Sequence, residues 1–292
     1  GSAIATRGGL TVPQRRLLVA CGAGAGLASV YNVPLGAALF TAEVLVGTLR
    51  LPVVLPALGC SGVATLTAHL GLPDRATYVG LEVGGSSARV VVWSLVAAPV
   101  LGLASVGLVR LIALVSHRSP RSLAFRLGAP LGACLVLAAV GGPLPQLYGN
   151  GQAMAEIAFL GAGSIGLFAF LAVLKPLVTA MFLGSGAAGG LFTPTLSSGA
   201  VLGAALGGVW GLMWPGTPVG AYAFLGAAAV LGAGMQAPLA ALALVLELTH
   251  TGFDLLVPLV LVTTLATAVA RAVDGYSIYS ARLSAPHPGE AS

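Results

Sequence analysis

Hydrophobic positions dominate this chain and run in long blocks, separated by short breaks that contain polar residues, Gly or Pro. A single membrane-spanning helix needs about 20 apolar residues. Several blocks are longer than this and are interrupted by Gly or Pro, which predicts two shorter helices in each. The blocks cover residues 17–47, 51–72, 90–116, 127–148, 153–183, 200–214, 219–249 and 254–273.

The composition supports a membrane location. Hydrophobic residues make up 57% of the chain and charged residues 7%, and the mean hydropathy is +1.00. A soluble domain carries roughly 25% charged residues. We therefore expect an all-α, polytopic membrane protein with roughly a dozen tilted helices, several of them only half-spanning. The 42 glycines are expected to allow close helix packing.

The net charge of +5 does not indicate nucleic-acid binding, because most cationic residues are scattered at predicted helix ends. Loops rich in Lys and Arg tend to be cytoplasmic, so the one dense basic group predicts a cytoplasmic loop. That group consists of His117, Arg118, Arg121 and Arg126.

Other site chemistries find little support. Cys21, Cys60 and Cys134 lie in apolar blocks without paired spacing, so neither a disulfide nor a metal site is expected. Residues 161–166 and 184–189 match a dinucleotide-binding glycine pattern, but outside a strand–turn–helix unit, so no cofactor is expected. An intramembrane serine hydrolase using Ser185 and His250 is an unfavoured alternative, and we expect no enzyme activity.

A glycine-dense segment interrupts the apolar pattern at residues 184–194, GSGAAGGLFTP. Irregular backbone at membrane depth is tolerated only where protein buries it or where it lines a cavity. A helix starting there presents free N–H groups and the positive end of its dipole. Such broken helices hold anions in transporters. The segment therefore predicts an intramembrane anion site.

Two segments resemble each other at an offset of 204 positions, Gly22–Glu43 and Gly226–Glu247. Each has a small-residue helix, an Asn or Gln, a proline two residues later, and one glutamate. Weak repeats of this kind are typical of transporter folds. The offset places the counterpart of the glycine segment before residue 1, so we expect the chain to lack the first helices of a longer fold.

Three separated motifs make the chain similar to the CLC family of chloride channels and chloride/proton antiporters. Residues 184–200 resemble the family's G-x-F-x-P filter motif. Residues 31–44, YNVPLGAALFTAEV, resemble its N-A-P-L-x-G-x-L-F-x-x-E helix. Residues 275–283, GYSIYSARL, resemble its last membrane helix. The resemblance implies a CLC-like inverted-repeat domain over residues 1–283, followed by a disordered tail at 284–292.

The resemblance also implies an anion site. The backbone amides of Leu191 and Phe192, next to Gly190, would donate hydrogen bonds to a chloride ion, and the Tyr279 hydroxyl would donate to the same ion. Neutral donors suit a site that must release its ion. The family's upstream gating-glutamate loop does not occur in these 292 residues.

Residues 43 and 44 indicate whether transport is coupled to protons. Proton-coupled family members carry two successive glutamates, whereas here Glu43 is followed by Val44. We interpret Glu43 as bonded to backbone donors near a helix end, with proton transfer as the alternative. Lys175, within an apolar block, either draws anions toward an inner vestibule or reaches the membrane interface.

The sequence-based hypothesis is passive permeation of chloride or a similar anion through a channel-like CLC protein. The alternative is chloride/proton exchange by an unconventional proton route. The resemblance implies a homodimer in a lipid bilayer, in a bacterial-type inner membrane.

Overall fold

The computed structural model describes residue 6 and residues 8–82, 84–117 and 123–282. The predicted tail at 284–292, and Arg118 and Arg121 of the basic group, lie outside the described residues. All regular secondary structure in the described part is helical, which confirms the predicted fold class.

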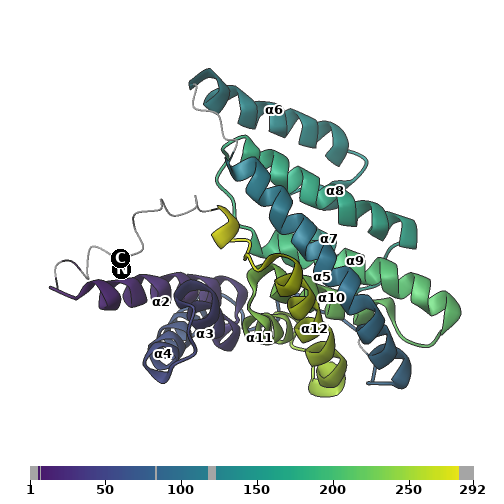
Figure 1. Cartoon of the computed structure of the whole chain (residues 1–292), viewed down its shortest axis with the longest axis horizontal. Helices are drawn as coiled ribbons and strands as arrows, with labels where there is room; N and C mark the ends of the chain where they lie inside the picture. The colour runs from purple at the N-terminus through teal and green to yellow at the C-terminus, as the bar shows by residue number, and fades with distance from the viewer. Residues whose placement is uncertain (1–5, 7, 83, 118–122, 283–292) are drawn as a thin grey trace.

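The helices form two groups in Figure 1, with α2, α3 and α4 at one end and the remaining helices stacked beside them. Figure 1 shows α6 and α8 at the far edge of the second group. The main helices are α2 (Val12–Tyr31), α3 (Pro34–Phe40), the π-helix η1 (Thr41–Val46), α4 (Leu51–Ala68), α5 (Ala88–His117), α6 (Leu123–Gly141), α7 (Gln152–Phe159), α8 (Ile165–Gly184), α9 (Phe192–Met213), α10 (Val219–Met235), α11 (Pro238–Thr249) and α12 (Leu256–Asp274). Short 3₁₀ turns are η2 (Pro145–Leu147), η3 (Phe253–Leu255) and η4 (Ser280–Arg282).

Helix lengths agree with a membrane protein of mixed full and partial spans. Five segments of the described residues are long and apolar enough to cross a bilayer, and four further apolar helices are shorter. The five are Leu51–Ala68, Ala88–Ser116, Ile165–Gly184, Phe192–Met213 and Phe253–Asp274. The shorter helices occur where Pro or Gly divides an apolar block, as the sequence predicts.

The core lies where α10 crosses α9. Residues 220–235 of α10 are all buried. A Cβ on Gly203 would lie 2.3 Å from the Tyr222 carbonyl oxygen, and one on Gly226 would lie 2.5 Å from the Gly199 carbonyl oxygen. The two backbones therefore touch across a seam that only glycine permits, the small-residue packing typical of membrane helices.

The two repeat units share their backbone geometry. Asn32 ends α2 with φ 57°, and Gln236 ends α10 with φ 56°, both in the left-handed region that terminates helices. In each unit a proline two residues later, Pro34 or Pro238, begins the next helix. The helices α3 and α11 pack against each other. The predicted repeat is therefore confirmed in the fold.

The molecule has two ends, named here by the basic loop. The basic-loop side holds the end of α5, the start of α6 and the end of α12, where Arg110 pairs with Asp274 at 2.7 Å. The opposite side holds residues 69–82 and 84–87, where the Tyr78 amide donates to the Leu248 carbonyl at 2.9 Å. Because α2 ends on the opposite side and α10 ends on the basic-loop side, the two repeat units run in inverted directions.

Candidate functional site

The glycine segment forms an irregular link between α8 and α9. It leaves α8 after Gly184, and Gly186 adopts φ +88°, a conformation that side chains disfavour. Leu191 is the N-cap residue of α9, directly before its first residue Phe192, and it is 2% exposed. In the described structure no side chain caps this helix, so its first amides lack a side-chain acceptor. A buried, uncapped helix start attracts an anion.

The predicted anion-site residues lie in two separate segments of the structure. Leu191 and Phe192 adjoin at the start of α9, directly after the unobstructed Gly190. Tyr279 comes from the C-terminal segment, where its ring packs edge-on against Phe40 with centroids 5.9 Å apart. The Ile278 amide donates to the Gly234 carbonyl at 2.7 Å and ties this segment to the end of α10.

Lys175 is 2% exposed within α8, so the interpretation that it reaches the membrane interface is wrong. Its Nζ donates to the Leu147 carbonyl at 3.2 Å and the Gly149 carbonyl at 2.9 Å. These carbonyls follow the far end of α6 and place the ammonium away from the basic loop. In the described residues no carboxylate pairs with it.

A cavity of about 330 Å³ extends from Lys175 to the glycine segment. Its lining includes Asn150, Gly189, Gly190 and Pro194. No carboxylate among the described residues offsets the Lys175 amino group, and the cavity connects it with the segment before α9. The cavity therefore has the electrostatics of an anion site.

The two repeat glutamates cap each other's helices. The Ala240 amide, at the start of α11, donates to Glu43 Oε2 at 2.7 Å. The amides of Leu35 and Gly36, at the start of α3, donate to Glu247 at 2.9 and 2.6 Å. Backbone donors at a helix end were the predicted partners of Glu43, and these contacts match that interpretation. The sequence did not indicate that each glutamate caps the other repeat's helix.

Val44 follows Glu43 within η1 and packs partly against the core. Its isopropyl group has no atom that can accept or release a proton. A proton path through this position would therefore need other groups.

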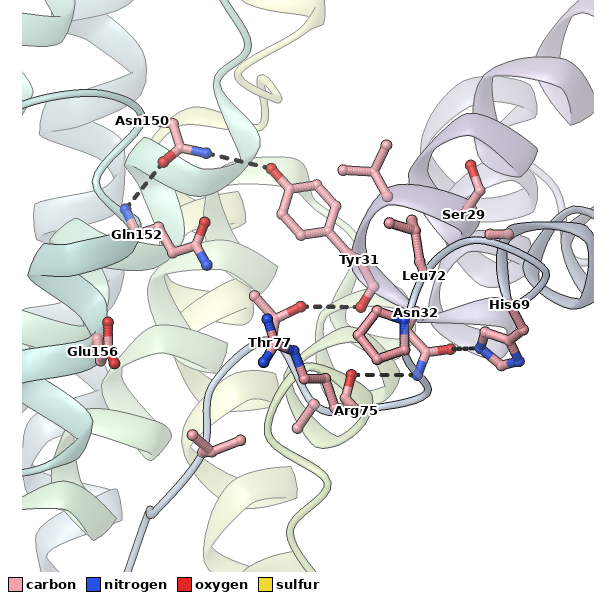
Figure 2. A pocket seen from close by; sticks show the side chains of 15 residues that line it. Ser29, Tyr31, Asn32, His69, Leu72, Arg75, Thr77, Asn150, Gln152 and Glu156 are labelled. Atoms are coloured by element: carbon pink, nitrogen blue, oxygen red, sulfur yellow. Dashed lines mark hydrogen bonds between the residues drawn. The ribbon is translucent and has the colours of Figure 1, made fainter.

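Sequence reasoning missed a second cavity, of about 500 Å³, on the side opposite the basic loop. Figure 2 shows Tyr31 extending across it from the end of α2 toward Asn150. The Tyr31 hydroxyl also lies 2.9 Å from the hydroxyl of Thr193, in the first turn of α9. The position of Tyr31 just before Asn32-x-Pro was the available indication, but no spacing indicated Asn150.

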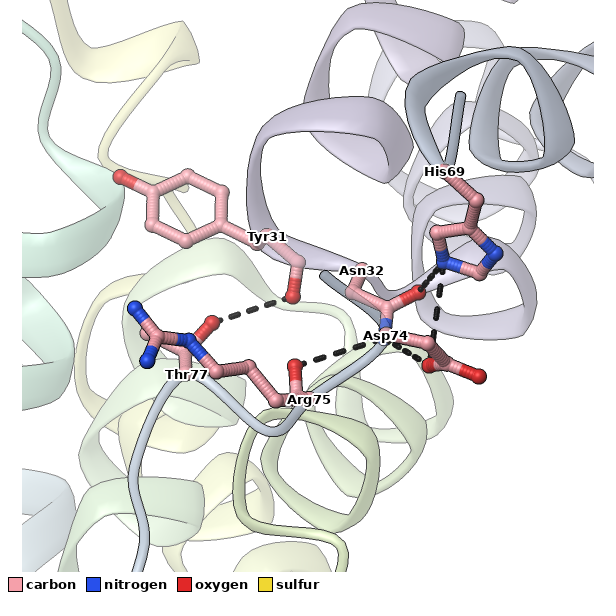
Figure 3. A network of polar contacts seen from close by, with 6 residues as sticks. All are labelled: Tyr31, Asn32, His69, Asp74, Arg75 and Thr77. Atoms are coloured by element: carbon pink, nitrogen blue, oxygen red, sulfur yellow. Dashed lines mark hydrogen bonds and ion pairs between the residues drawn. The ribbon is translucent and has the colours of Figure 1, made fainter. Parts of the chain in front are cut away.

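A polar network fixes the backbone that carries Tyr31, as Figure 3 shows. Asn32 Nδ2 donates to Asp74 Oδ1 at 2.8 Å, and Asn32 Oδ1 lies 3.0 Å from His69 Nε2. The Thr77 hydroxyl donates to the Tyr31 carbonyl at 3.0 Å. The left-handed turn at Asn32 is thus held by the 69–77 loop.

The enzyme alternative receives no geometric support. The Ser185 hydroxyl donates to the Phe182 carbonyl at 2.6 Å on the basic-loop side, whereas His250 ends α11 on the opposite side. No cluster of metal ligands occurs in the part of the chain that the structure describes.

Comparison with known proteins decides the family. The family model described as Voltage gated chloride channel matches residues 1–271. The chain belongs to this CLC family. A voltage-gated ClC-type chloride channel ClcB of Salmonella typhimurium is 33% identical over 271 residues, covering 90% of this chain and 64% of the relative.

Other CLC relatives carry exchanger names. An H(+)/Cl(-) exchange transporter ClcA of Yersinia pestis is 32% identical over 288 residues, 92% of this chain and 58% of the relative. The structure of a slow cyanobacterial Cl⁻/H⁺ antiporter matches with a TM-score of 0.81 at 24% identity, covering 95% of this chain and 66% of that one. The chain thus spans less than two thirds of these proteins and has the CLC fold, in a multi-pass membrane protein.

Proposed function

We propose that this chain forms the central part of the anion pathway in a CLC protein that transports chloride. The observation that carries the proposal is the buried, uncapped start of α9 after the glycine segment. Amides there can replace part of an anion's hydration without adding a fixed charge that would trap it. The activity is transport and not catalysis.

The proposed chloride ligands are the amides of Leu191 and Phe192 and the hydroxyl of Tyr279, with Gly190 allowing close approach of the ion. Support comes from the open space beside Gly190 and the absence of a capping side chain in the described residues. Lys175 raises the local anion concentration from its cavity behind the glycine segment.

Chloride/proton exchange, the alternative from the sequence, is better supported than passive permeation. Exchange transporters stand among the relatives that are about a third identical to this chain, beside proteins named as channels. Because Glu43 is bonded to Ala240 and Val44 is apolar, exchange here requires a proton route through other residues.

Exchange is tested by flux measurements on the full-length protein in proteoliposomes. An outward chloride gradient is expected to drive protons inward against their own gradient, with a fixed ratio of chloride to protons. Protein-free liposomes and a proton ionophore are the controls. Chloride flux that moves no protons against their gradient would refute exchange and support passive permeation. Absence of anion flux would refute the proposal of anion transport as a whole.

Lys175→Met should weaken the apparent chloride affinity of transport by about tenfold, because one positive charge near the ion is worth on the order of 1.4 kcal/mol at moderate separation. The chloride dependence of uptake measures the effect. Lys175→Arg keeps the charge and should retain most of the affinity. Equal affinities for the Met and Arg variants would show that the charge does not act on the ion.

We further propose that the protein is a homodimer in a bacterial inner membrane. The relatives come from bacteria. Apolar side chains of α4, including Leu51, Leu55 and Leu66, are largely exposed in a single copy, which suits burial against lipid or a second copy.

A further inference from the structure

Two hydroxyl groups from distant parts of the chain meet beside the start of α9. Tyr31 Oη and Thr193 Oγ1 lie 2.9 Å apart, and either atom can be the donor. The Tyr31 ring also packs on Phe192 with centroids 5.7 Å apart. Tyr31 therefore reaches the same helix end at which the glycine segment stops.

A third donor joins the pair from the segment before α7. Asn150 Nδ2 donates to Tyr31 Oη at 3.5 Å (Figure 2). Asn150 Oδ1 accepts from the Gln152 amide at 3.1 Å, which orients the NH₂ group toward the tyrosine. Asn150 lines both cavities, and Tyr31 lines the one of about 500 Å³.

The hydroxyl groups of Tyr31 and Thr193 together have one proton that no described residue accepts. The two hydroxyls carry two protons, and their mutual bond uses one of them. The Asn150 amide donates to Tyr31 and accepts neither proton. Among the described residues no other acceptor bonds either hydroxyl. Thr193 is 3% exposed, so its buried hydroxyl is satisfied by donating to Tyr31 Oη. The phenolic proton of Tyr31 is then left at the wall of the cavity of about 500 Å³. An anion between the hydroxyls and the amide would accept that proton.

We propose that Tyr31, Thr193 and Asn150 form a further anion-coordinating site, on the side of the filter opposite the basic loop. The proposal rests on the anion transport proposed above and adds ligands to it. All three donors are neutral, so they bind an ion without trapping it. The ligand class is a small monovalent anion that accepts several hydrogen bonds, with chloride as the probe.

The surrounding structure keeps Tyr31 in place when no ion is bound. Thr77 bonds the Tyr31 carbonyl, and the contacts of Asn32 with His69 and Asp74 hold the adjoining turn (Figure 3). The donors are therefore preorganised, which lowers the entropic cost of binding.

The test measures chloride binding by titration calorimetry, and radioactive chloride uptake, with the full-length protein. Tyr31→Phe keeps the ring on Phe192 and removes only the hydroxyl. Thr193→Ala removes its partner. Each variant should bind chloride about 3- to 10-fold more weakly, the usual effect of one hydrogen bond. The double variant should lose less than the product of the two, because the hydroxyls act as a pair.

Matched controls separate this effect from general damage. Tyr276→Phe changes a tyrosine that is 64% exposed, and Thr193→Ser keeps the hydroxyl, so both should bind chloride as the unmodified protein does. If the unmodified protein transports chloride and Tyr31→Phe binds it as tightly as Tyr276→Phe, the site is refuted while the proposed function stands. If the unmodified protein neither binds nor transports chloride, the proposed function fails first.

Discussion

Gly203→Val is expected to prevent the membrane domain from folding, because the added side chain would occupy space already filled by backbone. Its Cβ would lie 2.3 Å from the Tyr222 carbonyl oxygen and 2.9 Å from Gly226 Cα. Backbone cannot move aside as a flexible side chain can, so α9 and α10 would have to separate along the core. We expect the free energy of unfolding to fall by about 4 kcal/mol or more, the range seen for severe disruption of a core.

Gly211→Val is the matched control for this substitution. Gly211 lies in the same helix, and a Cβ there meets nothing within 4 Å. The yield of monodisperse protein in detergent and its thermal transition measure the difference. We expect little folded Gly203→Val protein and near-normal Gly211→Val protein. Two equally stable variants would mean that the helices do not cross as closely as described.

Glu247→Ala should destabilise the protein strongly, because it leaves the helix start at Leu35 and Gly36 without its acceptor. Both amides donate to this carboxylate. Leu35 is exposed and Gly36 is buried, and one buried donor left unsatisfied costs about 1–3 kcal/mol, so we expect the free energy of unfolding to fall by about that amount. Glu247→Gln keeps one acceptor oxygen, so its stability should fall between those of the unmodified protein and Glu247→Ala. Unfolding by a denaturing detergent, followed by circular dichroism, measures the loss.

Glu82→Ala, at an exposed loop position, is the control for removing a carboxylate. If Glu247→Ala and Glu82→Ala unfold at the same detergent concentration, the Glu247 carboxylate does not stabilise α3. The same unfolding measurement on Glu43→Gln, together with its proton flux in proteoliposomes, distinguishes the two interpretations of Glu43. A helix cap loses stability while proton coupling persists, whereas a proton carrier loses coupling while stability persists.

Much of the fold could be predicted from local features of the sequence. Apolar blocks interrupted by Gly and Pro indicated full and partial membrane helices, because helix length and breaks depend on neighbouring residues. The paired prolines, Pro34 and Pro238, indicated the repeat because proline favours the first turn of a helix. The glycine segment indicated the start of α9 for the same local reason.

The site was predicted only in part, because its remaining members meet through the tertiary fold. Lys175 could be singled out as an intramembrane cation, but its carbonyl partners follow a different helix, and no periodicity relates them. Tyr31 and Thr193 are 162 positions apart and meet only where the fold brings the end of α2 to the first turn of α9.

The sequence alone determined the membrane class, the CLC resemblance and a helix start after the glycine segment, since these depend on composition and on short contiguous motifs. The tertiary structure alone decided that Glu43 and Glu247 cap each other's helices, that Lys175 is buried, and that three neutral donors converge near the filter. The physical reason is that hydrogen bonds between separate helices depend on their relative placement, which packing across the whole molecule sets.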